Sequence, residues 1–205
     1  MANLEALLDP ATTAVVTMEM QRGVVGDLAT IADLAAAARG VDLIGGVTRL
    51  VDGARDAGVQ VCHATVSWRA DRLGTPLNTP MARALARNPA QILHGSDAAD
   101  LVPSLDTDSR DLRSTRHHGF TPFTGTDLDA LLRSCGITTI VATGVSINVG
   151  VLGLCLTGTD LGYRVVLPTD AVAGLPARYA EEVIHHTLAP LCTLTTIDDV
   201  LAVWR

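Results

Sequence analysis

The fold is decided by residues 137–167, ITTIVATGVSINVGVLGLCLTGTDLGYRVVL. A run rich in β-branched residues (137–142) is followed by a longer amphipathic stretch (146–161) and then by a second apolar run (163–167). The first and last segments have the composition of buried strands, and the middle one has the length of a helix. Such a strand–helix–strand order predicts two parallel strands joined by a helical crossover.

The same alternation continues in both directions along the chain. Strands are predicted at residues 14–18, 59–66, 111–115, 137–142, 163–167 and 192–196. Helices are predicted at residues 41–57, 81–87, 126–134, 146–161, 176–188 and 197–204, with loops at 67–80 and 88–108. Gly58 is placed to cap the first of these helices, and Thr126 to begin the third. The pattern predicts an α/β fold, a three-layer α/β/α sandwich with a six-stranded parallel sheet.

Composition favours one globular domain over residues 1–205. Of the 205 residues, 48% are hydrophobic and 18% are charged, which is enough apolar material for a large core. The formal net charge is −7, and no basic cluster is present, so nucleic acid is not an expected partner. All 15 basic residues are Arg, and the chain has no Lys.

The cysteines and the beginning of the chain indicate a cytoplasmic protein. The four cysteines, which form no CxxC pair, are Cys62, Cys135, Cys155 and Cys192. We interpret them as reduced core thiols, and expect neither a metal site nor a cofactor. No positively charged segment precedes an apolar stretch at the start, and no apolar run reaches membrane-spanning length, so no membrane association is expected.

In a parallel sheet of this type the ligand site lies beyond the carboxyl ends of the strands. The first predicted strand ends at Glu19, which is followed by Gln21 and Arg22. Because an ionised carboxylate at the end of an apolar strand loses its hydration, Glu19 is expected to be paired or to hold its proton. The simpler alternative is a strand-end Glu that reaches solvent.

The loops after the second and third strands supply further candidates. Trp68 and Arg69 are candidates for the pocket wall, as are Gln21 and Arg22. After the third strand, Arg116 could hold a fixed charge, whereas His117 could exchange protons near neutral pH. A solvated loop is the alternative for the histidine. Nearby phenylalanines, Phe123 among them, are expected in the core or the pocket wall.

The segment after the fourth strand begins a helix at a tight turn. Backbone N–H groups at residues 145–150, including those of Val145, Ser146 and Val149, could bind an anion or an oxyanion. An ordinary turn with Ser146 as the helix N-cap explains the same residues. A third alternative is a serine nucleophile at Ser146, with Asp170 and His185 or His186 following in the required order.

Several of these segments together resemble the isochorismatase-like hydrolases, also called the cysteine hydrolase family. The resemblance rests on Phe123-x-Gly125-Thr126-Asp127-Leu128, Leu131-Leu132, Gly136-Ile137, Gly144-Val145, Gly162-Tyr163-Arg164-Val165-Val166 and Asp170-Ala171-Val172, and on the Met20-Gln21 start. It covers roughly residues 12–200 and implies a homodimer or higher homo-oligomer. It also implies a site built from an Asp after the first strand, a Lys after the third, and a Cys at the start of the following helix.

All three of those positions differ here. Glu19 stands in place of the Asp, His117 or, with a shift of one residue, Arg116 in place of the Lys, and Gly150 in place of the Cys. Cys155 is predicted to point into the core, because five helical residues turn it about 140° away from Gly150 and move it about 7.5 Å along the axis. The thiol chemistry that the resemblance implies is therefore not expected, and the His cluster of its zinc-binding branch is missing after the second strand.

Two functions remain open. The first is a hydrolase of a small, anionic organic molecule that works by acid/base chemistry, with Glu19 as proton donor or base and His117 as its helper. The resemblance includes a branch that has Gly at the Cys position and cleaves an enol ether without a thiol. The second is a catalytically silent descendant that binds a metabolite or a protein partner in the retained pocket.

Overall fold

A computed structural model describes residues 4–88, 92–106 and 108–205. Parts of the predicted 88–108 loop, residues 89–91 and 107, lie outside the described residues. The strands are β1 (Thr13–Met18), β2 (Gln60–Val66), β3 (Leu112–Arg116), β4 (Thr139–Val145), β5 (Arg164–Pro168), β6 (Val172–Ala173) and β7 (Thr193–Thr195). Their order across the sheet is β3-β2-β1-β4-β5-β7, and β6 pairs with β4.

Every strand pair in the sheet is parallel, so the predicted parallel α/β architecture is confirmed. The six predicted strands lie within a few residues of their predicted bounds. The additional strand, β6, has two residues, which is too short for a periodic pattern. The six residues of β1 are all buried, since both faces of a parallel sheet are covered by helices.

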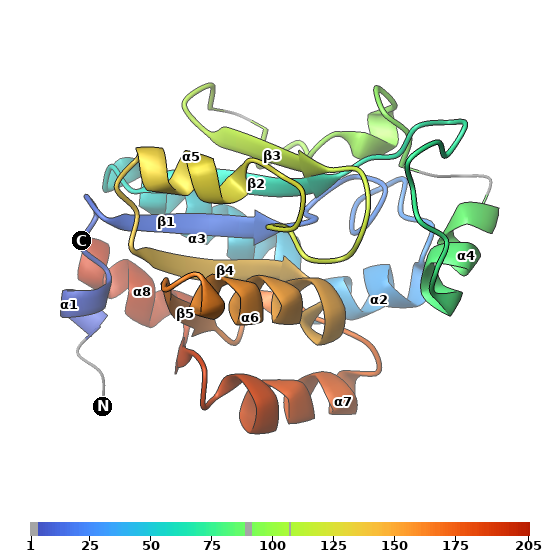
Figure 1. The fold of residues 1–205 in the computed structure, drawn as a ribbon. Helices are drawn as coiled ribbons and strands as arrows, with labels where there is room; N and C mark the ends of the chain where they lie inside the picture. The colour runs from blue at the N-terminus through green and yellow to red at the C-terminus, as the bar shows by residue number, and fades with distance from the viewer. Residues whose placement is uncertain (1–3, 89–91, 107) are drawn as a thin grey trace.

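Helices cover the two faces of the sheet (Figure 1). They are α1 (Leu4–Leu7), α2 (Ala32–Gly40), α3 (Leu43–Asp56), α4 (Pro80–Arg87), α5 (Leu128–Ser134), α6 (Leu152–Asp160), α7 (Ala177–Glu182) and α8 (Ile197–Trp204). Short 3₁₀ (Asp97–Ala99) and π-helical (Ile147–Val151, Val183–Leu188) turns complete them. One core packs α3 and α8 against the sheet, and the other packs α5, α6 and α7 against the opposite face.

Helix α3 forms for the reason that its sequence indicates. Its apolar residues recur at helical spacing, and five of them are buried: Leu43, Val47, Leu50, Val51 and Ala54. Gly58 follows the helix with φ +74°, the left-handed conformation that favours glycine after a helix end. Among residues 4–88, 92–106 and 108–205, no helix has both the length and the apolar content needed to cross a membrane.

Two helix starts differ from the prediction. The segment before α3, where no helix is predicted, contains α2, whose run of alanines has high helix propensity but gives little apolar periodicity. Helix α5 begins at Leu128 with Asp127 as its N-cap residue, not Thr126. The Thr126 hydroxyl still accepts from the Leu128 N–H at 3.3 Å, and it donates to the Pro122 carbonyl at 2.5 Å.

A buried polar cluster joins α3 to the first three strands. The Asp111 carboxylate accepts a hydrogen bond from Arg55 of α3 at 2.5 Å and lies 3.0 Å from His63 Nε2. The other ring nitrogen of His63 lies 2.7 Å from the Thr17 hydroxyl. Burial, the largest single influence, raises the pKa of Asp111, but the hydrogen bonds from His63 and Arg55 lower it overall. The cluster ties α3 to the sheet beneath it.

The order of the strands reverses between β1 and β4, which lie side by side at the centre of the sheet. Chain connections leave these two strands toward opposite edges, which opens a crevice at their carboxyl ends. Gly144, near the end of β4, has φ +102°, and a Cβ there would lie 2.2 Å from the Met18 carbonyl oxygen. Only glycine allows the two backbones to approach this closely.

Candidate active site

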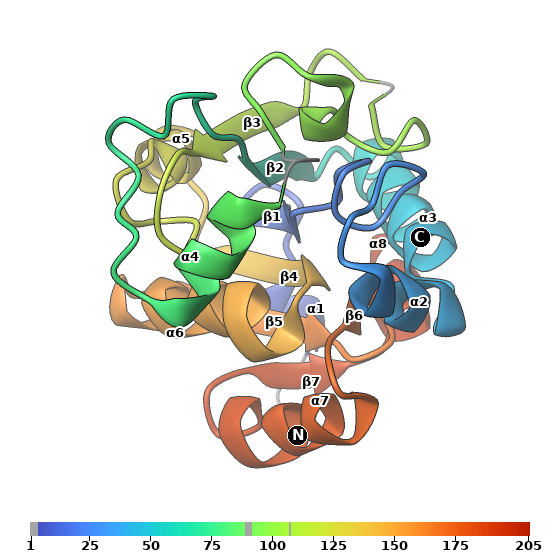
Figure 2. The same ribbon diagram turned by 90° about the vertical axis from the view of Figure 1, so that its right-hand side faces the viewer.

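A cavity of about 350 Å³ lies at this crevice. Both charged lining residues, Glu19 and Arg116, lie at the ends of β1 and β3. The uncharged polar ones are Ser146 and Asn148 after β4, Thr30 before α2, and Asn88 after α4. Figure 2 views the molecule from the carboxyl ends of the strands, with α4 in front of β1 and β4. The cavity is thus found where the topology of the sheet predicts it.

Glu19 is held in this cavity in a strained backbone conformation. Its φ is +53°, in the left-handed region that non-glycine residues rarely occupy. Its N–H donates to the Ala64 carbonyl at 2.9 Å, and its carbonyl accepts from the Gln21 N–H at 2.8 Å. The side chain of Glu19 is 16% exposed, which places the carboxylate inside the cavity rather than in bulk water.

Arg116 lies directly opposite Glu19, and the two form an ion pair through Nη2 and Oε1. Arg116 is 5% exposed, and its Nε donates to the Gly119 carbonyl at 3.2 Å. Its Nη1 is buried and hydrogen-bonds to none of the described residues. Glu19 is therefore paired, one of its two expected states, and one Arg116 donor still lacks a partner.

The sequence favoured His117 as the helper of Glu19, but the structure gives no contact between the two residues. Strand β3 ends at Arg116, and since side chains alternate along a strand, the two neighbours point to opposite sides. The ring Nδ1 of His117 lies 2.9 Å from the Ser67 carbonyl oxygen, and the residue is exposed. The side chain that pairs with the Glu19 carboxylate is therefore Arg116 and not His117.

Three other predicted pocket residues lie outside the cavity lining. Gln21 is buried, and its side-chain amide accepts from Val66 N–H and donates to the Val66 carbonyl, both at 2.9 Å. Gln21 thus fixes the turn that carries Glu19. Arg22 is paired with Asp27, and Arg69 is paired with Asp71 on the surface.

Of the five remaining candidate binding residues, three line the cavity and two do not. Trp68, Ser146 and Val149 line the cavity, whereas Phe123 and Val145 do not. Phe123 belongs to the core and stacks on the Tyr163 ring at a centroid distance of 6.0 Å. Val145 is fully buried in the other core.

One donor predicted for the anion site after β4, the Val149 N–H, is used within the turn itself. The N–H groups of Val149 and Val151 both donate to the Ser146 carbonyl, at 3.1 and 3.0 Å. Ser146 occupies the N-cap position, but its side chain makes no capping hydrogen bond. The alternative with Ser146 as N-cap is therefore correct for the position of the residue, but the predicted side-chain cap does not form.

The alternative of a serine nucleophile at Ser146 is contradicted by the geometry. The Asp170 carboxylate accepts from the Ile197 N–H at 2.9 Å and so serves the start of α8. His185 and His186 are exposed, and His186 is paired with Glu182. The three groups do not form a hydrogen-bonded triad.

None of the described cavity-lining residues is a cysteine. Cys62, Cys155 and Cys192 are buried, as predicted, whereas Cys135 is exposed, contrary to the prediction. Burial raises the pKa of Cys62 to about 12, and a hydrogen bond with Cys192, together with burial, raises the pKa of Cys155. The prediction that Cys155 points into the core is confirmed.

Gly150 lines the cavity, but the space beside it is not free for a larger side chain. A Cβ at this position would lie 2.9 Å from Met18 Cε and 3.0 Å from the Val145 carbonyl oxygen. These contacts are shorter than ordinary van der Waals separations, so neighbouring atoms would have to move. The cavity is therefore shaped around a glycine.

Gly150→Ala is expected to lower the free energy of unfolding by about 1–2 kcal/mol, because overpacking outweighs the gain in helix propensity. Gly158→Ala, in the following helix α6, is the matched control, since its Cβ would meet neighbours at 3.6 Å. We expect it to stabilise the protein by up to about 1 kcal/mol. Urea unfolding of both variants tests the prediction. A Gly150→Ala variant as stable as the wild type would show that Met18 and Val145 move aside without cost.

Much of the cavity wall is apolar and was not predicted. It comes largely from two helices, with Ile31 and Leu34 at α2 and Met81 and Leu85 on α4. Helix α4 has no buried residue although it carries apolar side chains. A short amphipathic helix inside a polar region is the signal that could have indicated a cavity wall.

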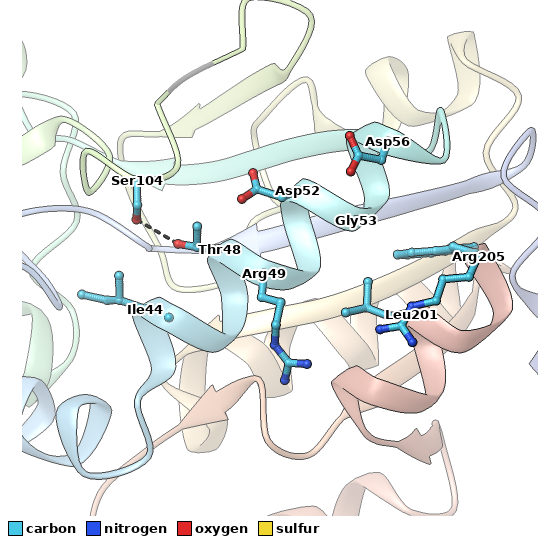
Figure 3. Close-up of a pocket in the computed structure, with 11 residues that line it drawn as sticks. Ile44, Thr48, Arg49, Asp52, Gly53, Asp56, Ser104, Leu201 and Arg205 are labelled. Carbon is cyan, nitrogen blue, oxygen red and sulfur yellow. Dashed lines mark hydrogen bonds between the residues drawn. The ribbon is translucent and has the colours of Figure 1, made fainter.

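A larger groove of about 640 Å³ lies along α3 and α8 (Figure 3). It is lined by Ile44, Thr48 and Leu201 with charged neighbours, and the Thr48 and Ser104 hydroxyls are 2.8 Å apart. None of the predicted site residues lines it. We assign the candidate active site to the smaller cavity, because it lies at the carboxyl ends of β1 and β4.

In the part of the chain that the structure describes, no three His, Cys, Asp or Glu side chains gather where they could hold a metal ion. The fold and the lining residues together define an α/β protein with a cavity at its topological switch point, where sheets of this type bind ligands. The chain belongs to the isochorismatase family, because the Isochorismatase domain matches residues 13–199.

Two similar proteins and one solved structure agree with this family assignment. The isochorismatase family protein YecD of Escherichia coli O157:H7 is 27% identical over 198 residues, which cover 95% of this chain and 97% of that protein. Ureidoacrylate amidohydrolase RutB of Serratia proteamaculans is 29% identical, over 84% of this chain and 74% of that protein. A cysteine hydrolase from Pseudomonas syringae pv. phaseolicola 1448A shares the fold, with a TM-score of 0.78, 24% identity, and coverage of 97% and 94%.

Proposed function

We propose that this isochorismatase-family hydrolase acts on a small organic molecule by acid/base chemistry, without a thiol nucleophile. The observation that carries the proposal is the Glu19 carboxylate, held inside the cavity opposite Arg116 in a strained conformation. Strained residues cluster at functional sites, and a sheltered carboxylate is a competent general base. No thiol among the described lining residues competes for this role.

In the proposed reaction, Glu19 takes a proton from a water molecule in the cavity. The water oxygen bonds to the electrophilic carbon of the substrate, and the bond to the leaving group breaks. The leaving group then takes the proton from Glu19, which restores the carboxylate. Arg116 orients Glu19 through Nη2 and is placed to stabilise negative charge that develops on the substrate.

Glu19→Gln is expected to lower turnover of the hydrolysed substrate at least about 100-fold, because the amide cannot accept the proton from water. Amides and lactones, whose carbonyl carbon is the electrophile, form the substrate panel. Glu181→Gln is the matched control, since Glu181 is exposed on α7, and it should retain the wild-type rate. Equal rates in wild type and Glu19→Gln would refute the assignment of Glu19.

A second candidate function, ligand binding without turnover, is favoured by a different observation. The space beside Gly150 is restricted by Met18 and Val145, so the position of the family thiol is closed. A protein of this kind would be stabilised against heat by a metabolite that is recovered unchanged after hours. Consumption of the stabilising metabolite would exclude this alternative in favour of the hydrolase.

A further inference from the structure

The charge of the cavity lining bears on the substrate that it takes. Among the described residues that line the cavity, Arg116 is the one cation and Glu19 the one anion. The two are paired with each other, and both side chains are largely shielded from solvent. An anionic ligand would bring a second negative charge beside Glu19 with no further cation to balance it, which is unfavourable in a sheltered site.

The part of the lining supplied at α2 and α4 is mainly apolar, with Thr30 and Asn88 as its polar members. Ile31 and Leu34 face the cavity from α2, and Met81 and Leu85 face it from α4, with Ile92 and Phe120 nearby in the lining. Side chains of this kind bind the hydrocarbon part of a ligand by excluding water. The cavity thus combines a charged end, formed by Glu19 and Arg116, with a largely apolar wall.

The polar end has a donor without a partner. Arg116 uses Nη2 for Glu19 and Nε for the Gly119 carbonyl, while Nη1 is buried and hydrogen-bonds to none of the described residues. A buried donor without a partner is costly, and an acceptor oxygen on a bound molecule would supply one. A neutral carbonyl oxygen does so without adding charge next to Glu19.

We infer that the substrate is an uncharged, mainly apolar molecule with one acceptor oxygen, bound with its hydrocarbon part against α2 and α4 and its oxygen toward Arg116. This deepens the proposed function and rests on the same cavity. It departs from the anionic substrate that the sequence suggested, because that expectation did not include the pairing of Arg116 with Glu19.

Three matched pairs of probes test the inference by isothermal titration calorimetry: phenylacetamide and phenylacetate, 4-phenylbutanamide and 4-phenylbutanoate, and hexanamide and hexanoate. Within each pair that binds, the amide should bind at least tenfold more tightly than the carboxylate. A carboxylate that binds as tightly as its amide, or no binding by any of the six, would overturn the inference.

Helix α4 offers a variant that reverses the preference at small cost to the fold, since none of its residues is buried. Leu85→Arg places an unpaired cation in the wall, so the carboxylates should gain at least tenfold in affinity relative to the amides. Ala84→Arg is the matched control, because Ala84 is exposed and does not line the cavity, and it should keep the wild-type preference. Equal shifts in both variants would overturn the placement of the ligand against α4.

Glu19→Gln provides an independent arm. Removal of the carboxylate leaves Arg116 without its counter-charge, so the carboxylates should gain affinity at least tenfold in this variant, and an unchanged preference would overturn the inference. These measurements report binding and require no turnover. An amide preference with equal turnover in wild type and Glu19→Gln would refute the proposed catalysis alone, whereas a carboxylate preference with Glu19-dependent turnover would refute the substrate class alone.

Discussion

Arg116→Met is expected to lower turnover at least about 100-fold and the free energy of unfolding by about 3–5 kcal/mol. The substitution leaves the Glu19 carboxylate in a sheltered cavity without its cation, and it removes the donor to the Gly119 carbonyl. The loss of one partner of a buried pair is more damaging than the loss of both, because one charge stays uncompensated. Urea unfolding and steady-state kinetics measure the two effects.

Two further variants separate the causes of this loss. His117→Ala, one residue away, should change turnover less than threefold, because His117 is exposed and does not line the cavity. The double variant Glu19→Gln/Arg116→Met should be more stable than Arg116→Met alone, since no charge is left unpaired. A His117→Ala variant with the larger loss of turnover would show that the histidine, not the arginine, assists Glu19.

Asp111→Asn is expected to lower the free energy of unfolding by about 3 kcal/mol at pH 7. The side chains of Arg55 and Asp111 are 9% and 8% exposed, and the carboxylate also lies 3.0 Å from His63. Asparagine has the shape of aspartate but not its charge, so Arg55 loses its buried counter-ion. Arg55 keeps an ion pair with Asp52, which is exposed. Exposed Asp56, on the same helix, is the matched control, and Asp56→Asn should change stability by less than about 0.5 kcal/mol.

The difference between wild type and Asp111→Asn should depend on pH in a defined direction. The pKa of Asp111 is lowered in the folded protein, so its stabilising effect is fully present above the pKa of an unfolded Asp, about 3.9. It is lost as the pH falls through the lower folded pKa. Urea unfolding at pH 7, 5 and 3 should therefore show a constant difference down to about pH 5 and a smaller one at pH 3. A difference that grows toward pH 3 would contradict the ionised cluster.

The order of strands and helices could be predicted because burial repeats regularly along the sequence. The five apolar positions of α3 and the β-branched runs of the sheet are decided by local spacing. Glu19 could be identified because a carboxylate follows a mainly apolar strand at the edge where parallel sheets bind ligands. Its backbone strain and its ion pair depend on the tertiary structure, and no local pattern indicates them.

The partner of Glu19 could not be decided from sequence, because a shift of one residue at the end of β3 exchanges the two faces of the strand. The predicted end at residue 115 left both Arg116 and His117 open, and the observed end at Arg116 places the guanidinium in the cavity. The wall from α2 and α4 was missed for another reason. The loops between the strand ends and these helices carry no pattern that fixes where the helices pack, and only the folded chain places them beside the cavity.

The role of Gln21 also depends on contacts that sequence does not reveal. A polar residue next to Glu19 suggested the pocket wall, yet its amide bonds to both backbone groups of Val66 and is fully buried. Two hydrogen bonds to one strand end fix the turn that carries Glu19. Such a residue supports the site without touching a ligand.

The central claim is that Glu19 directs water onto the substrate with no covalent intermediate on the chain. A single turnover in H₂¹⁸O, with excess enzyme and rapid acid quench, tests it most directly by mass spectrometry of both product and protein. The account predicts one ¹⁸O atom in the product of the first turnover and an unchanged mass of the chain at every time point. A chain that gains the mass of a substrate fragment, at a cysteine or at Glu19, would contradict it.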